Sequence, residues 1–93
     1  MFALPDPSDY RGRNLFTDVE LQNANLQRAN LKEMFFQVGN FDESSFDGSK
    51  LIGVDFEGTS LVDASFVRAD LRNATFYLVS ALFATFAYAR MEN

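Results

Sequence analysis

The sequence predicts an all-β fold, a four-sided solenoid that turns a corner every five residues. Large apolar residues recur at every fifth position, small uncharged residues recur two positions before them, and like residues recur at every twentieth position. A period of five builds no stripe on an α-helix and alternates between the faces of a flat strand. A chain that bends at each fifth position accounts for all three observations.

The large apolar residues define the centre of each side. From residue 16 onward all sixteen central positions are apolar, and only Ala81 is small. The central residues are Phe16, Leu21, Leu26, Leu31, Phe36, Phe41, Phe46, Leu51, Phe56, Leu61, Phe66, Leu71, Phe76, Ala81, Phe86 and Met91. From Asp18 onward, none of the seventeen charged residues occupies a central position or the position two before it. These two positions are therefore predicted to point inward.

A second period predicts four sides in each coil. Steps of twenty connect Phe16, Phe36, Phe56 and Phe76 on one side, and Leu31, Leu51, Leu71 and Met91 on another. They connect Leu26, Phe46, Phe66 and Phe86 on a third side, and the mixed set Leu21, Phe41, Leu61 and Ala81 on the fourth. Like residues thus stack on like, as expected if successive coils lie ~4.8 Å apart.

Several of these units match a known repeat. The segments 24–28 (ANLQR), 29–33 (ANLKE) and 69–73 (ADLRN) fit the consensus A-(D/N)-L-x-x in full. The chain therefore resembles the pentapeptide-repeat family over residues 14–93, although Phe35 places an aromatic residue where Asp or Asn is usual. The resemblance implies a right-handed quadrilateral β-helix, here of about four coils. Residues 1–13 are predicted to form an N-terminal capping segment or a flexible tail.

The last coil differs from the earlier ones in its outward residues. Its outward positions hold five large apolar side chains, namely Tyr77, Leu78, Leu82, Phe83 and Tyr88. Equivalent positions in earlier coils are mostly polar or charged. A contiguous apolar patch usually marks a contact, so we predict homodimerisation through this coil. The alternatives are contact with another partner, side chains that cover one another, and a following helix that covers the coil. Family members with this layout often dimerise by their C-terminal ends.

The outward charges divide between two halves of the solenoid. The two adjacent sides centred on the Phe16 and Leu21 ladders carry seven acids and no Lys or Arg. These acids are Asp18, Glu20, Asp42, Glu43, Asp55, Glu57 and Asp63. The other two sides carry six basic residues and four acids. This acidic half is either an ordinary soluble surface or a partner-binding face that imitates duplex DNA or enters a basic groove.

The composition excludes several classes of function. The chain has no Cys and no His, which removes thiol, disulfide and imidazole chemistry and the usual zinc sites. Its formal charge of −5 argues against direct binding of nucleic acid. The Ser and Thr residues at inward positions are expected to bond to the backbone. We expect no catalytic residues, no metal, no cofactor and no membrane span, and a cytoplasmic location because no signal-peptide pattern is present.

Two functional hypotheses follow from these patterns. The first is a rigid, non-catalytic structural module that presents a surface to a protein partner, since repeat folds are built for surface display. The second is an inhibitor or protector of DNA gyrase or a related topoisomerase that mimics duplex DNA, as some family members are. The acidic half favours the second hypothesis. The short length and the unbroken five-residue register count against it.

Overall fold

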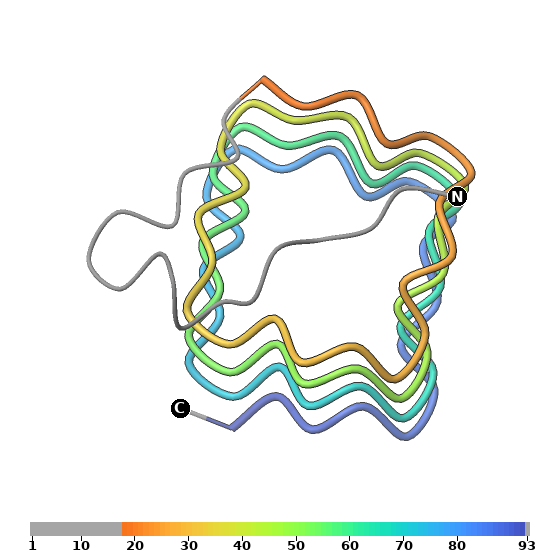
Figure 1. Cartoon of the computed structure of the whole chain (residues 1–93), viewed down its shortest axis with the longest axis vertical. Helices are drawn as coiled ribbons and strands as arrows, with labels where there is room; N and C mark the ends of the chain where they lie inside the picture. The colour runs from red at the N-terminus through yellow and green to blue at the C-terminus, as the bar shows by residue number, and fades with distance from the viewer. Residues whose placement is uncertain (1–17, 93) are drawn as a thin grey trace.

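The computed structural model describes residues 18–92, which wind around a four-sided outline with successive coils in register (Figure 1). The predicted capping segment, residues 1–13, lies outside the described residues, as do residues 14–17 and 93. The bends fall every five residues, so one coil takes twenty residues. This confirms the predicted repeat and the predicted stacking of each residue on the residue twenty positions later.

The β-structure of this solenoid consists of single-residue bridges. Every bridge is parallel and joins residues twenty positions apart, as in Glu20 with Asn40 and Asp70 with Arg90. Within residues 18–92 no bridge extends into a continuous strand or helix, because each side is only five residues long and ends in a turn. We call the residue in these bridges, one before each central residue, the bridge position.

The turns place one residue of every unit in the left-handed region. This residue, two after the central residue, is here called the second turn position, and it has φ between 57° and 72° in every described unit. Positive φ at the third residue of a four-residue turn is typical of type II turns. Gly48, Gly53 and Gly58 fit this geometry without a steric cost, whereas Val38 is β-branched and adopts it at φ 57°. Gly39 lies at an inward position instead and has no positive φ, so turn geometry does not explain that glycine.

Backbone hydrogen bonds between coils hold the solenoid together. In the unit 44–48, the N–H of Phe46 donates to the carbonyl of Ser65 at 2.7 Å and the N–H of Gly48 donates to that of Val67 at 2.8 Å. The N–H of Ser65 in turn donates to the carbonyl of Ser44 at 2.9 Å. Each side of a coil therefore offers two donors and one acceptor to the coil that follows it.

The Asn or Asp of the repeat caps the turn of its own unit. The N–H between the two backbone donors makes no backbone hydrogen bond, and in several units it donates to a side-chain oxygen instead. Asn40 Oδ1 accepts from the N–H of Asp42 at 3.0 Å, and Asp55 Oδ1 accepts from that of Glu57 at 2.9 Å. This bond explains physically why polar residues with a short side chain favour the bridge position.

The core is a column of stacked side chains. From Phe36 to Leu71 every central residue is at most 2% exposed. The rings of Phe46 and Phe66 stack at 4.8 Å with an angle of 1°, and Phe66 stacks on Phe86 at 4.9 Å with an angle of 3°. We number the sides by their central residues: side 1 with Phe36, Phe56 and Phe76; side 2 with Leu21, Phe41, Leu61 and Ala81; side 3 with Leu26, Phe46, Phe66 and Phe86; side 4 with Leu31, Leu51, Leu71 and Met91.

The buried hydroxyl groups are bonded to the backbone, as predicted. Ser44 Oγ donates to the carbonyl of Leu21 at 2.7 Å and accepts from the N–H of Ala24 at 3.1 Å. Ser49 Oγ donates to the carbonyl of Phe46 at 2.6 Å, and Thr59 Oγ1 donates to that of Phe36. No polar side-chain atom buried within residues 18–92 lacks a partner.

Candidate functional site

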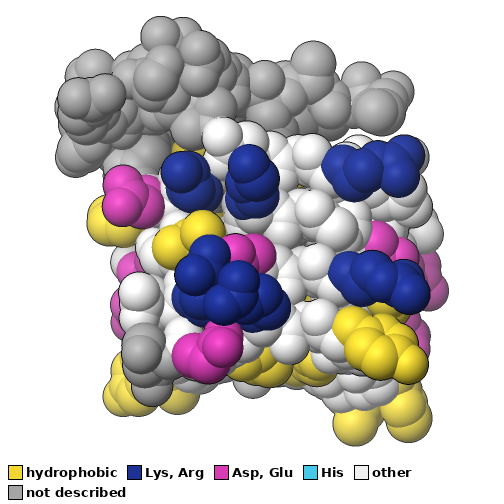
Figure 2. All heavy atoms as spheres, turned by 90° about the horizontal axis from the view of Figure 1, so that it is seen from below, with side chains coloured by type: hydrophobic (Ala, Val, Ile, Leu, Met, Phe, Trp, Pro, Cys, Tyr) yellow, Lys and Arg dark blue, Asp and Glu magenta, His cyan; other side chains and the backbone are white. Residues whose placement is uncertain are grey.

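The five apolar residues predicted to form an interface are all exposed. Tyr77, Leu78, Leu82, Phe83 and Tyr88 have exposed fractions between 64% and 81%. They occupy three consecutive corners of the last coil, residues 74–92, and Figure 2 shows hydrophobic side chains along the lower edge of the molecule. The structure therefore brings them together around one end of the solenoid. Their role as an interface stays a prediction.

The inward side chains of the last coil add to this surface. Phe76, Ala81 and Phe86 are only partly buried, although their counterparts one coil earlier are fully buried. Met91, which the sequence places among the central residues, is 50% exposed. These side chains are not part of the predicted interface, because their phase in the repeat marks them as core residues. Their place in the last described coil, which has no described coil on its far side, is the signal that could have shown them to be partly exposed.

The acidic residues lie on sides 1 and 2 as predicted, but they do not form one uniform group. Asp42 Oδ1 accepts from the Ser60 hydroxyl and, at 2.9 Å, from the N–H of Val62 in the next coil. Asp55 bonds to the N–H of Glu57 and, through Oδ2, to Gln37 Nε2 at 2.9 Å. These two carboxylates therefore stabilise the stacking of coils, which the sequence pattern did not reveal.

Two other acids of this half, Glu43 and Asp63, have free carboxylates. Glu43 and Asp63 are exposed, occupy successive second turn positions on one corner, and form no side-chain hydrogen bond or ion pair within residues 18–92. Glu20 accepts from Gln22 Nε2 at 2.7 Å. Asp18 is exposed and Glu57 is partly buried. A partner with basic groups could thus reach Glu43 and Asp63 without disturbing the fold.

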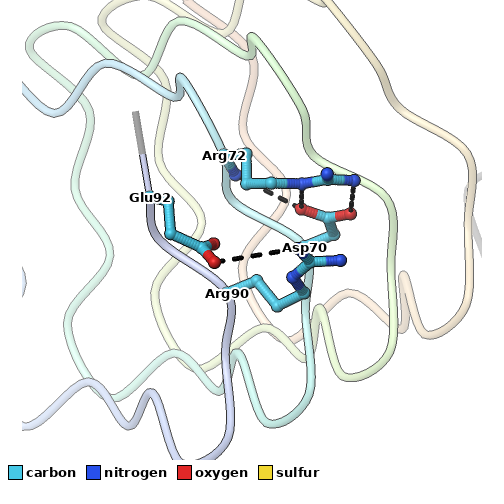
Figure 3. Close-up of polar contacts among 4 residues, drawn as sticks. All are labelled: Asp70, Arg72, Arg90 and Glu92. Atoms are coloured by element: carbon cyan, nitrogen blue, oxygen red, sulfur yellow. Dashed lines mark hydrogen bonds and ion pairs between the residues drawn. The ribbon is translucent and has the colours of Figure 1, made fainter.

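Sides 3 and 4 carry the basic residues, which Figure 2 shows on one face together with acidic side chains. Arg72 donates two hydrogen bonds to Asp70, from Nε at 2.8 Å and from a terminal nitrogen at 2.6 Å. This guanidinium lowers the pKa of Asp70 below its ordinary value. Arg90 lies opposite Asp70 in the next coil and forms an ion pair with Glu92 at 3.7 Å (Figure 3). The four groups bring opposite charges together and leave no net charge.

The sequence predicts neither a catalytic site nor a metal site. Among residues 18–92, no three His, Cys, Asp or Glu side chains gather in a way that could hold a metal ion. The same segment contains no helix long and apolar enough to cross a membrane.

Comparison with known proteins identifies the repeat. The pattern of pentapeptide repeats matches residues 40–76 in eight copies. No curated protein matches the chain.

Three solved structures of similar backbone share low sequence identity with the chain. QnrB1, a plasmid-mediated fluoroquinolone resistance protein, is 20% identical with a TM-score of 0.45, and the match covers 77% of this chain and 39% of QnrB1. Rfr23 from the cyanobacterium Cyanothece 51142 is 22% identical with a TM-score of 0.38, over 83% and 59% of the two chains. HetL from Nostoc sp. strain PCC 7120, which is involved in heterocyst differentiation regulation, is 18% identical with a TM-score of 0.29, over 84% and 47%. The chain spans at most 59% of the length of these proteins, and values this low transfer no function.

Proposed function

Since residues 40–76 of this chain are pentapeptide repeats, we propose that the protein is a non-catalytic interaction module, a right-handed β-helix of about four coils that forms a homodimer through its last coil. The exposure of five large apolar side chains at one end of the solenoid carries this proposal. Large apolar side chains exposed together at one end usually mark a contact, and burying them against a second copy is the symmetric solution.

The outward positions of the inner coils support the assignment to the last coil. On side 1, the second turn position is occupied in three successive coils by Val38, Gly58 and Leu78. Val38 is thus the one large apolar residue that precedes Leu78 at this position. At the same position of side 2, the charged residues Glu43 and Asp63 precede Phe83. Phe35 and Val38 are exposed on side 1 of an inner coil, and the other exposed large apolar residues of the described segment all lie in the last coil, so most of the apolar surface is at the end of the solenoid.

Light scattering over a range of protein concentrations tests this proposal. We expect a mass of twice the chain, and we expect Leu78→Glu to weaken the dimer by at least about 100-fold, because a carboxylate in an apolar contact costs several kcal/mol. The matched control is Val38→Glu, on the same corner two coils earlier and also exposed, which should leave the dimer intact. A chain that stays monomeric at high concentration contradicts the proposal.

A second candidate function rests on the acidic half. Sides 1 and 2 carry seven acids without a basic residue, and a dimer would extend this surface. Such a surface could occupy a site for duplex DNA on DNA gyrase or a related topoisomerase and inhibit or protect the enzyme. The free carboxylates of Glu43 and Asp63 are the residues best placed to contact a basic groove.

A gyrase supercoiling assay with and without the protein tests this second function. Glu43→Lys should abolish the effect. Glu33→Lys makes the same change of charge at the same turn position, but on side 4, and should retain it. No change in supercoiling at micromolar protein, or equal loss in both variants, contradicts a role for the acidic half.

A further inference from the structure

All the basic side chains of residues 18–92 lie on side 4 or at its corner with side 3, and Figure 2 shows Lys and Arg gathered on one face. They form two sets of three that occupy the same positions two coils, or forty residues, apart. The first basic set is Arg28, Lys32 and Lys50, and the second basic set is Arg68, Arg72 and Arg90. The two sets can therefore be compared position by position.

The second basic set encloses a carboxylate. Arg72 donates two hydrogen bonds to Asp70, and Arg90 is the parallel-bridge neighbour of Asp70 in the next coil (Figure 3). Both arginines lower the pKa of Asp70, Arg72 mainly through its side-chain hydrogen bonds and Arg90 through its charge. Arg90 is in turn paired with Glu92 at 3.7 Å. The centre of this set is therefore a carboxylate between two cations.

The first basic set repeats these positions without the acids. Asn30 stands at the position equivalent to Asp70, with Lys50 as its parallel-bridge neighbour and Lys32 two residues along the chain. The second acid is replaced by Ile52. The side chains of Lys32 and Lys50 are exposed and form no hydrogen bond or ion pair within residues 18–92. The centre of this set is therefore a neutral amide between two unpaired cations.

The corner residues of the two sets differ in the same way. In the second set the guanidinium carbon of Arg68 lies 5.3 Å from the centre of the Tyr88 ring. The equivalent neighbour of Arg28 is Gly48, which offers no side chain. A Cβ added to Gly48 would lie 3.2 Å from Arg28 Cγ, so the alkyl stem of Arg28 lies close to the next coil while the residue as a whole stays exposed. Arg28 thus adds a third cation that has no partner within the described segment.

The local charge around the first basic set is positive, although the chain as a whole is negative. Between residues 28 and 53, Glu33 is the one acid on side 4, so three cations stand against one acid and the net charge there is +2. The seven acids of sides 1 and 2 lie on the other half of the solenoid, and salt screens charges beyond about 8–10 Å. This part of the surface therefore attracts an anion.

We propose that the first basic set binds a carboxylate from an acidic, extended segment of a partner protein, in the position that Asp70 occupies in the second set. This carboxylate lies over Asn30 between Lys32 and Lys50, and a second carboxylate of the segment reaches Arg28. Asn30 Oδ1 accepts from the N–H of Lys32 at 3.4 Å, which leaves its NH₂ group available to donate. The site lies on a side of the solenoid, so it needs neither the last coil nor a dimer.

Fluorescence anisotropy tests the site with a labelled peptide in which Glu alternates with Gly, since alternate residues of an extended chain face the same way. We expect binding that weakens as salt is added, and no binding of the same peptide with Gln in place of Glu. Asn30→Asp should weaken binding by at least about 5-fold, because the chain then supplies the carboxylate itself, as Asp70 does. The matched control Asn25→Asp makes the same change at the bridge position of side 3, away from Lys32 and Lys50, and should change the affinity by less than about 2-fold.

The second basic set provides the converse test. Asp70→Asn makes its centre resemble that of the first set and releases Arg72, so titration calorimetry should show more Glu peptide bound per chain than for the unmodified protein. All three substitutions exchange Asn and Asp, which both fit the repeat, and the chain should stay folded. An unchanged amount of bound peptide in Asp70→Asn would contradict the equivalence of the two sets.

The remaining outcomes identify other occupants. Equal loss of affinity in Asn30→Asp and Asn25→Asp, or absence of peptide binding, overturns the proposal. Stronger binding of a short DNA duplex than of the Glu peptide would make phosphate the ligand and overturns it as well. A mass that rises with concentration in the unmodified chain but not in Asn30→Asp would place the acidic half of a second copy on this site instead of a partner protein.

Discussion

The inner coils, residues 34–73, and the last coil, residues 74–92, follow the same backbone path but differ in what they bury. The turn angles are alike, with φ of 57° at Val38 and 63° at Phe83. Every inward side chain of the inner coils is buried, whereas those of the last coil are only partly buried or, at Met91, exposed. A repeat therefore sets its own shape locally, while its burial depends on a neighbouring coil on each side.

The two regions also use their outward positions differently. The inner coils place Asp42 and Asp47 where their carboxylates cap the amides of Val62 and Val67 one coil later. The equivalent side-chain positions in the last coil hold Leu82 and Ala87. The coil between them holds Val62 and Val67 at these positions although another coil follows it, so the carboxylate caps belong to one inner coil rather than to all of them.

The largest effect on the free energy of unfolding is expected from removing a ring in the middle of a stack rather than at its end. Phe66→Ala should lower the free energy of unfolding by about 3–5 kcal/mol, because the ring is fully buried between Phe46 and Phe86. Phe86→Ala should cost no more than about 2 kcal/mol, because that ring is partly exposed. Urea unfolding measures both, in chains that also carry Leu78→Glu so that dimerisation does not contribute. Equal losses would show that the last coil is as well packed as the inner ones.

A smaller effect is expected from hydroxyl groups that only the inner coils bury. Ser44→Ala should destabilise the chain by about 1–2 kcal/mol, because it removes the donor to the Leu21 carbonyl and the acceptor for Ala24. Ser80→Ala, an exposed position in the last coil, should change the stability by less than about 0.5 kcal/mol. Thermal or urea unfolding of the two variants measures the difference, and a neutral Ser44→Ala would contradict the structural role of the hydroxyl.

Substitutions at the second turn position separate the energetic cost of a positive φ from the effect of side-chain contacts. Val38→Gly should stabilise the chain by up to about 1 kcal/mol, since a β-branched residue is strained at positive φ and its side chain is mostly exposed. Gly48→Ala should cost about 1–2 kcal/mol, because φ is +69° and the new Cβ would crowd Arg28 Cγ. Urea midpoints give both values, and a destabilised Val38→Gly would mean that its contact above Gly58 outweighs the strain.

The smallest effect lies at the junction of the two regions, where Asp70 and Arg72 pair beside Arg90. Asp70→Asn should cost less than about 1 kcal/mol at neutral pH, because Arg72 is 38% exposed and exposed ion pairs are weak. The folded pKa of Asp70 lies below its unfolded value, so the stabilisation is present above the unfolded pKa and is lost as the pH falls through the folded pKa. Unfolding curves of the two chains should therefore converge in acid, and a constant difference would contradict the ion pair.

Much of the fold could be predicted from the sequence because the repeat makes the information redundant. Phe46, Phe66 and Phe86 mark the same inward position in three successive coils. A register shifted by one residue would have placed charged side chains in the core. The exposed residues of the last coil were predicted on the same basis, since Leu78 and Phe83 occupy outward phases. The structural roles of Asp42 and Asp55 were not predicted, because they depend on which atoms lie opposite them in neighbouring coils.

The period, the four sides, the inward positions and the division of charge can all be found in the sequence, because each follows from counting residues along the chain. Contacts between coils, which the sequence does not show, establish which carboxylates are bonded and that Met91 is half exposed. The physical reason is that these properties belong to pairs of coils rather than to one unit. A residue acquires them only when the chain has wound far enough to place a neighbour beside it.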